Sequence, residues 1–302
     1  MVKSSSSYSH IPVTTAGALT PITQNAPATP PSVNAIIRFR AFLNFFFLLL
    51  IASLLTRAAE PLRNAGSPMM LPFKCTAEDI AQAGLTCSED APCPVYLELS
   101  SAASLGNKLF VAGNLHTESA TLYSVFLESD DEAASWTEPG ARIRGADLDQ
   151  IQFPDFEHGW ISGGMLQPMA RDPFFFTTSD GAKSWQRKPL FEDGTAGSIY
   201  SFWFDSRNHG MLVLDKGSGS SRYALYESPT GGETWTIRES SAKPILIKSM
   251  PPPGTGGWRV RADGKAHVYL IEKASGENWK PVASFLVRVG SCKPGEPEAE
   301  AK

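Results

Sequence analysis

The chain has 302 residues, of which 27 are basic, 31 are acidic and 42% are hydrophobic. Residues 1–59 contain four basic residues and no acidic one, so the remaining chain carries 23 basic and 31 acidic residues, a net charge of −8. A protein this acidic repels polyanions, which argues against nucleic acid as a partner. The five histidines are scattered and the cysteines lack zinc-site spacing, so we expect no metal and no cofactor.

The first 59 residues have the composition of a leader followed by an apolar segment. Residues 1–37 are rich in Ser, Thr and Pro and are predicted to be disordered. Residues 38–59 contain the apolar stretch 41–55, which as a helix would span about 22 Å, less than the roughly 30 Å hydrocarbon slab of a membrane. We expect a signal peptide cleaved after Ala58 or a membrane anchor, with a buried core helix as the third alternative. The first two place the rest of the chain in the periplasm or outside the cell, with membrane contact only through 41–55.

Two short regions flank the long middle part of the chain. Residues 60–92 are predicted to be a linker with one short helix at 76–83, which Thr76 can cap and Gly84 can end. Residues 293–302 are predicted to be a disordered tail.

The four cysteines are Cys75, Cys87, Cys93 and Cys292, an even set. In an oxidising compartment we expect two disulfides, and free thiols in a reducing cytosol are the alternative. Of three possible pairings we favour Cys93–Cys292 with Cys75–Cys87. Cys93 precedes the first predicted strand of the repeat region and Cys292 follows the last one, so closing the strands into a ring would bring these two residues together.

Four stretches within 93–292 repeat, and each ends in a tryptophan. They are residues 129–136, 178–185, 228–235 and a more divergent copy, 272–279. Successive tryptophans are 49, 50 and 44 residues apart. Each unit also holds several short predicted strands, which in the second unit are 150–154, 159–162 and 173–177. Repeats of this length and content predict a stacked or radial β architecture.

The strand before each repeated stretch is apolar on both faces. The adjacent pairs are Phe126 and Leu127, Phe175 and Phe176, Leu225 and Tyr226, and Tyr269 and Leu270. Neighbouring residues on a strand point to opposite faces, so these strands are expected to be buried on both sides. Sheets packed between two neighbours, as propeller blades are, have this property. The sequence therefore predicts an all-β protein, a β-propeller of about four four-stranded blades over 93–292.

The four stretches resemble the Asp-box of BNR repeats, Ser/Thr-x-Asp-x-Gly-x-x-Trp. The copies depart from it at Ala133 and Ala182, which replace Gly, at Thr230, which replaces Asp, and at Glu272 and Ala274 in the last copy. In proteins with this motif the box is a hairpin turn on the rim of a blade, where polar side chains bond to backbone donors and the Trp packs beneath. The resemblance implies structural roles, not catalytic ones, for Ser129, Asp131, Trp136, Thr178, Asp180, Trp185, Ser228, Thr230, Trp235, Gly276 and Trp279.

Residues 159–185 are similar to the photosystem II stability/assembly factor-like repeats. This resemblance implies a non-catalytic module for protein binding or assembly, with another protein or a glycan as partner. A sialidase-like glycosidase is one alternative, because sialidases also carry Asp-boxes, although the chain has no Phe-Arg-Ile-Pro motif. A true photosystem II assembly factor in a photosynthetic host is the other.

In a propeller, the loops between second and third strands share one face with the loops between blades, opposite the boxes. This rule predicts that Arg142, Arg144 and Arg171 lie near one another on that face, with His116 as a further candidate. Such a basic spot on an acidic protein would contact an anionic group of a partner. Separate, solvated arginines are the alternative.

Overall fold

The structure of the protein is a computed structural model that describes residues 60–251 and 256–294. The predicted leader and apolar segment, 1–59, and the tail from 295 onward lie outside these ranges. Within the described ranges, no helix is both long enough and apolar enough to cross a membrane.

The described chain is almost entirely β structure. In order, its elements are β1 (Leu62–Arg63), α2 (Ala77–Gln82), β2 (Cys93–Leu105), β3 (Lys108–His116), β4 (Thr121–Ser129), β5 (Ser135–Trp136), β6 (Ala146–Gln152), β7 (Gly159–Met165), β8 (Arg171–Thr178), β9 (Gln186–Pro189), β10 (Ser198–Phe204), β11 (Gly210–Asp215), β12 (Tyr223–Ser228), β13 (Thr236–Ser241), β14 (Trp258–Asp263), β15 (Val268–Ser275), β16 (Asn278–Leu286) and β17 (Arg288–Cys292). The short helix lies where the sequence predicts it. Thr76 caps it, because its hydroxyl accepts a hydrogen bond from the Asp79 amide while the Asp79 carboxylate accepts one from the Thr76 amide.

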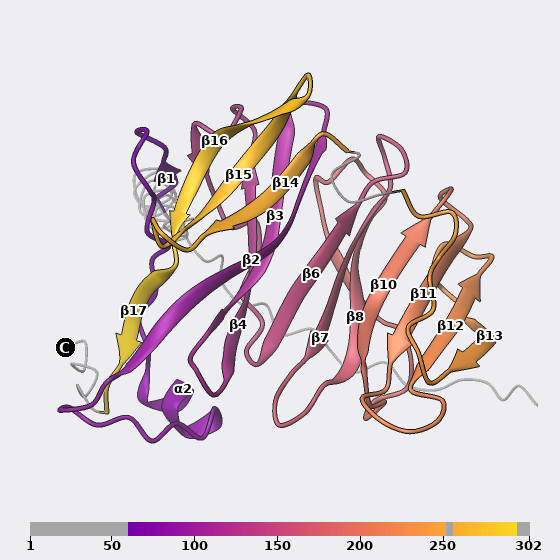
Figure 1. Cartoon of the computed structure of the whole chain (residues 1–302), viewed down its shortest axis with the longest axis horizontal. Helices are drawn as coiled ribbons and strands as arrows, with labels where there is room; N and C mark the ends of the chain where they lie inside the picture. Colours follow the sequence, from indigo (N-terminus) through magenta and orange to yellow (C-terminus); the bar gives the residue numbers. More distant parts are fainter. Residues whose placement is uncertain (1–59, 252–255, 295–302) are drawn as a thin grey trace, which may run out of the picture. The chain divides into compact units, whose positions relative to one another are not determined.

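The strands form antiparallel sheets that follow one another as blades do (Figure 1). Three sheets have four strands each, in the orders β17-β2-β3-β4, β6-β7-β8-β9 and β10-β11-β12-β13. The fourth sheet, β14-β15-β16, has three strands, and β1 pairs with β5 in a two-stranded ribbon. The predicted all-β propeller of about four blades is confirmed, with the difference that the last blade has three strands.

The cores lie between neighbouring sheets. Phe174 packs with Phe110 and Leu148 between the first and second sheets, whereas Phe175 packs with Phe202 between the second and third. A further core joins the first sheet to the fourth, where Trp136 meets Phe285 edge to face. Both faces are covered on β4 and β8, where Leu127 and Phe175 are buried and their neighbours half-buried, whereas both members of the predicted pairs on β12 and β15 are half-buried.

The third and fourth sheets differ from this pattern. The outer face of the third sheet, at Val213 and Tyr223, is covered by Ile245 and Ile247. No buried cluster among the described residues joins this sheet to β14-β15-β16. Residues 245–247, which precede the fourth sheet where a first strand would be expected, instead cover the end of the third.

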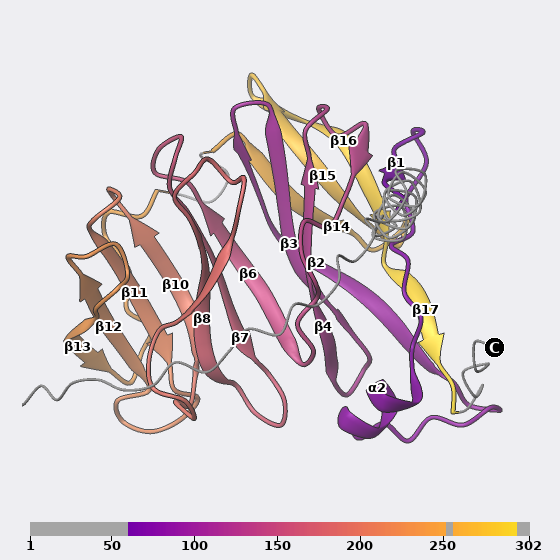
Figure 2. The ribbon, with the colours of Figure 1, turned by 180° about the vertical axis from the view of Figure 1, so that it is seen from behind.

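The two ends of the repeat region meet, because β17 pairs with the start of β2 and Cys292 lies directly opposite Cys93 (Figure 2). The disulfides nevertheless join Cys75 to Cys292 and Cys87 to Cys93, so the predicted pairing is wrong. The tight turn at 88–91 brings Cys87 to a Cα separation of 5.3 Å from Cys93. Cys75, just before α2, lies 5.1 Å from Cys292. Proximity in the fold decides the pairing, and spacing along the chain does not report it.

Candidate functional site

In the first three repeated turns the Ser, Thr and Asp side chains bond within the turn, whereas the ring Nε1 atoms of Trp136, Trp185 and Trp235 are buried without a hydrogen-bond partner. In the second turn Thr178 Oγ1 donates to Asp180 Oδ1 at 2.8 Å and accepts from the Ala182 amide at 3.0 Å. The Asp180 carboxylate also accepts from the Ser184 amide at 3.1 Å and the Ser184 hydroxyl at 2.6 Å. These bonds, led by the one from the Ser184 hydroxyl, hold the pKa of Asp180 well below its usual range. Ser129, Asp131 and Ser135 repeat the arrangement in the first turn.

In the third and fourth turns, where the sequence departs from the motif, the hydrogen bonds within the turn differ from those of the first two. Thr230 replaces the aspartate, and its hydroxyl accepts from the Thr234 amide at 2.9 Å, while Ser228 accepts from the Gly232 amide at 2.8 Å. In the fourth turn the buried Glu272 instead receives Arg259 and Arg261 at 2.7 and 2.9 Å. Gly276 there has φ 64°, a conformation that favours glycine.

The tryptophans that close the first three turns pack between blades, while the fourth, Trp279, lies under the Arg259 guanidinium. Trp136 is fully buried, and Trp185 meets Phe126 edge to face with ring centroids 5.4 Å apart. Trp235 packs in the same way on Phe204 at 6.0 Å. We infer that the turns fasten the blades, because their polar atoms bond to one another and offer little to a ligand.

Each of the three arginines predicted to form a basic spot lies within ion-pair distance of a carboxylate. Arg142 forms a two-pronged ion pair with Glu138 at 2.7 and 2.6 Å. Arg144 contacts Glu78 at 2.6 Å and Asp79 at 3.4 Å, both in helix α2.

Arg171 begins β8 and lies 3.6 Å from the carboxylate of its neighbour Asp172. The Arg142 guanidinium also donates to the Pro72 carbonyl, so Arg142 and Arg144 both fasten residues 72–79 to the first blade. Within the described chain Arg171 makes no hydrogen bond or ion pair to residues 72–79, so its contacts differ from those of Arg142 and Arg144.

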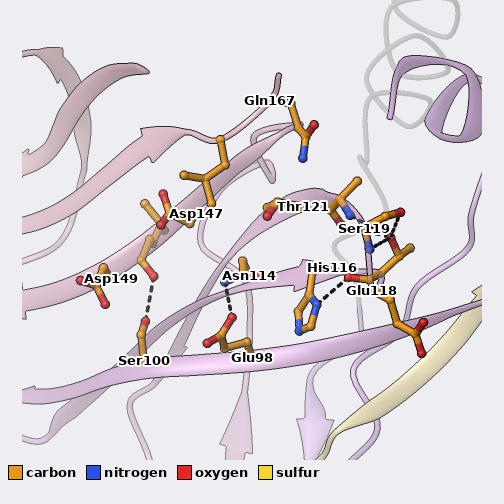
Figure 3. A pocket seen from close by; sticks show the side chains of 14 residues that line it. Glu98, Ser100, Asn114, His116, Glu118, Ser119, Thr121, Asp147, Asp149 and Gln167 are labelled. Atoms are coloured by element: carbon orange, nitrogen blue, oxygen red, sulfur yellow. Dashed lines mark hydrogen bonds between the residues drawn. The ribbon is translucent and has the colours of Figure 1, made fainter. Parts of the chain in front are cut away.

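His116, the fourth residue of that prediction, lines a recess between the first and second blades. The recess has a volume of about 500 Å³. Figure 3 shows Asp147 and Asp149 on β6 at one side, and Glu98, Asn114 and His116 on β2 and β3 at the other. The turn at 117–120, which includes Glu118, completes the rim. Four carboxylates line the recess, and neither a lysine nor an arginine is among the described residues that do so.

Strand alternation directs these side chains into the recess. Along β2, Leu97 and Leu99 are buried in a core while Glu98 between them is exposed. Along β6, Ala146 and Leu148 are buried, and Asp147 and Asp149 occupy the opposite face. The first strands of two neighbouring blades therefore supply the recess.

The carboxylates that line the recess repel one another, because no lysine or arginine among the described lining residues neutralises them. Burial, with repulsion from Asp149 and Glu98, raises the pKa of Asp147 to about 6. The pKa of Asp149, whose side chain remains exposed, is also raised, first by partial desolvation and then by the Glu98 charge. The Gly164 amide donates to Asp147 at 3.1 Å and opposes the rise in the pKa of Asp147 without cancelling it.

Asn114 and His116 line the recess together with the carboxylates. Asn114 is 8% exposed, and its amide nitrogen donates to Glu98 at 3.2 Å, but its oxygen has no hydrogen-bond partner. The His116 Nδ1 lies 2.9 Å from the Thr117 carbonyl and so carries the proton in the neutral ring, which leaves Nε2 as an acceptor. An unsatisfied buried acceptor costs about 1–3 kcal/mol, and the Asn114 oxygen is enclosed by protein atoms.

Among residues 60–251 and 256–294, no three His, Cys, Asp or Glu side chains converge as a metal would require.

Sequence reasoning named His116 as part of a basic spot, not of an acidic recess, and did not name Glu98, Asn114, Asp147 and Asp149. The second blade was predicted to begin at 150, whereas β6 begins at Ala146. The alternation of Asp147 and Asp149 with Ala146 and Leu148 is the signal that would have extended the strand and placed both carboxylates on one face.

Comparisons with known proteins show likeness only at the level of solved structures. No protein-family profile and no curated protein matches the chain. The structure "YCF48 bound to D1 peptide" is 17% identical, with 63% of this chain and 56% of that chain covered and a TM-score of 0.37. YCF48 from Cyanidioschyzon merolae is 16% identical over 65% of this chain and 57% of that one, with a TM-score of 0.31.

A GH74 xyloglucanase from Xanthomonas campestris is 16% identical over 71% of this chain and 32% of that one, with a TM-score of 0.31. This chain thus spans little more than half of each YCF48 structure and about a third of the xyloglucanase. Likeness at these TM-scores assigns no partner, substrate or residue role to this chain.

Proposed function

We propose that the chain is a non-catalytic binding module for another protein, exported or membrane-anchored, and that the recess between the first and second blades is its binding surface. The observation that carries this proposal is the set of like-charged side chains in the recess, which the fold itself leaves unneutralised. Folding favours neutralised charge, so uncompensated carboxylates with raised pKa values are typical of a functional site.

The repeated turns on the opposite face differ from the recess in the pKa of their carboxylates, and this difference supports the recess as the binding surface. The carboxylate of Asp180 accepts hydrogen bonds from groups of the same turn, and its pKa is lowered. The same holds for Asp131. Carboxylates bonded in this way stabilise their own turns and are less available to a ligand than the carboxylates of the recess.

Export is supported by the two disulfides, since such bonds persist in oxidising compartments. The signal peptide or anchor predicted at 38–59 lies outside the described residues and remains part of the proposal.

A sialidase-like activity is less well supported by the geometry. A sialoside carries a carboxylate, which needs cationic side chains, and the recess is lined by four carboxylates and by no arginine among the described residues. We expect no hydrolysis of a fluorogenic sialoside above the rate without protein. Hydrolysis that is lost in the Asp147→Asn variant would instead make this chain an enzyme.

Site-directed cross-linking tests the binding proposal. A photoreactive amino acid replaces Ser119 on the recess rim or, as the matched control, Asp130 in the first repeated turn; both residues are exposed. We expect protein adducts from position 119 in the native envelope and few from position 130. Adducts confined to position 130, or absent from position 119, would remove the recess as the binding surface.

A further inference from the structure

We propose that His209 is a pH-sensitive latch on the rim of the third blade, which fastens the turn at 205–209 to strand β12 while its ring is charged and releases one contact when the ring loses a proton. The latch lies outside the acidic recess and does not depend on the binding function proposed above. The evidence is the contacts of the two ring nitrogens.

Each nitrogen of the His209 ring faces a carboxylate. Nδ1 lies 2.7 Å from Asp205 Oδ2 at the start of the turn, and Nε2 lies 2.8 Å from Glu227 Oε1 on β12. An ionised carboxylate only accepts hydrogen bonds, and a neutral imidazole carries a single N–H. Both contacts are therefore hydrogen bonds only when the ring is doubly protonated and positively charged.

The charged groups around the ring favour this state. Arg238 on β13 donates to Glu227 Oε2, the oxygen that His209 does not use, and together the two cations lower the pKa of Glu227. Among the described residues, the carboxylates within ion-pair distance of the ring are those of Asp205 and Glu227. Their hydrogen bonds, that of Glu227 first, raise the pKa of His209 above its ordinary value.

The second blade provides a comparison. His158 occupies the equivalent place, directly before the glycine that begins the second strand of its blade, and its Nδ1 lies 3.1 Å from both oxygens of Asp155. Thr177 occupies the position that Glu227 has in the third blade, since each directly precedes the first residue of a repeated turn. A neutral ring can satisfy the single carboxylate beside His158 but not the two beside His209. The second carboxylate therefore gives the third blade a latch that the second blade lacks.

The latch has a direction in pH. A histidine whose pKa is raised on folding adds stability below the ordinary value, near 6.5, and that stability is lost as the pH rises through the folded value. Acid strong enough to protonate the carboxylates removes the acceptors as well. The latch is thus closed in mildly acidic solution and opens as the solution becomes alkaline.

The turn that the latch holds forms one side of a second recess. The Gly231 amide donates to the Asn208 carbonyl at 2.6 Å and so joins the turn at 205–209 to the third repeated turn. Arg207, Thr230 and Gly231 line a recess of about 290 Å³ shared with the second blade. Deprotonation of His209 would loosen this side, so the shape of the second recess would depend on pH.

NMR on the full chain with the histidine ring nitrogens labelled tests the latch, and His209→Gln identifies the His209 signals. We expect both ring nitrogens of His209 to be protonated at about pH 6. The midpoint of the His209 titration should move downward in Glu227→Gln and in Asp205→Asn, because each change removes one acceptor charge. Glu239→Gln is the matched control, since Glu239 is an exposed carboxylate on β13, and should leave the midpoint unchanged.

Amide hydrogen exchange measures the opening. The protection of the Gly231 amide, corrected for the intrinsic pH dependence of exchange, should fall about two- to fivefold as His209 is deprotonated, the range expected of a partly exposed ion pair. In Glu227→Gln this protection should be low above and below the His209 titration. The Gly181 amide, which donates to the Glu157 carbonyl at 3.0 Å in the second blade, is the internal reference and should change less.

Two results would overturn the proposal. One is a His209 titration that is the same in the wild-type chain, Glu227→Gln and Asp205→Asn. The other is a Gly231 protection that does not change with the charge of the His209 ring.

Discussion

Phe174 and Phe175 are adjacent on strand β8 and both are fully buried, yet their rings belong to different cores. Phe174 faces the first blade, and Phe175 faces the third and lies edge to face with Phe202 at 4.8 Å. One strand thus ties three blades together. We expect Phe174→Ala and Phe175→Ala each to lower the free energy of unfolding by about 3–5 kcal/mol, because each leaves a cavity in a separate core.

Urea unfolding checks this prediction, with Phe156→Ala as the control, since Phe156 is 78% exposed and should change stability by less than about 0.5 kcal/mol. The effects of Phe174→Ala and Phe175→Ala should differ clearly from that of the control. A loss confined to one of them would mean that β8 is packed on one face only.

The disulfides are expected to contribute unequally. Cys75–Cys292 closes a loop with a sequence separation of 217, and Cys87–Cys93 one of 6. In the chain-entropy model, replacing the first pair with alanine should cost about 5 kcal/mol and the second about 2 kcal/mol. Unfolding of the two double variants measures this difference, and peptide mapping without reductant identifies the bonds. Recovery of a peptide joining Cys93 to Cys292 would contradict the structure.

The carboxylate of Asp180 should make stability depend on pH. Its pKa is lowered in the folded state, first by the Ser184 hydroxyl, whereas an unfolded aspartate titrates near pH 4. Its contribution is therefore present above about pH 4 and lost as the pH falls further. Asp180→Asn should lower stability at neutral pH and weaken the fall in acid, whereas Asp130→Asn should do neither. Identical acid-unfolding curves for wild type and Asp180→Asn would refute this role.

Asp147 should have the opposite effect. Its pKa is about 6 in the folded state, so the folded protein holds this proton more tightly than the unfolded chain does. The groups around it are Asp149 on its own strand, Glu98 on β2, the Gly164 amide on β7, and His116 and Glu118 on the recess wall. The stabilisation is present below about pH 4 and is lost as the pH rises through 6.

Asp147→Asn should therefore raise the free energy of unfolding at pH 7.5 by about 1–3 kcal/mol and flatten the decline between pH 4 and 6.5. Thermal or urea unfolding across this range measures the change. A variant less stable than wild type at pH 7.5 would show that the carboxylate stabilises the fold, which would remove one argument for a functional recess.

The blade architecture could be predicted because its cause is local. The period of the tryptophan turns and the paired apolar residues, such as Phe175 and Phe176, are fixed by the alternation of strand side chains and are readable in the sequence. The disulfide pairs could not be predicted, because the turn at 88–91 and the position of Cys75 beside Cys292 arise only in the folded chain.

The recess depends on two strands from different blades, β2 and β6, whose approach no sequence spacing records. The arginines selected from the sequence carry the right charge for a binding spot, but Glu138, Glu78 and Asp172 lie close enough to neutralise them. Such ion pairs form across loops and are invisible before the loops are placed.

The most direct test of the recess as the binding surface uses the partner recovered through position 119. Its affinity is measured for the wild-type chain, for Asp147→Asn with Asp149→Asn, and for Asp130→Asn, at low and high salt. We predict that the recess variant binds about tenfold more weakly and loses most of the salt dependence, while Asp130→Asn binds like wild type. Equal affinity of the recess variant and wild type at both salt concentrations would contradict the account.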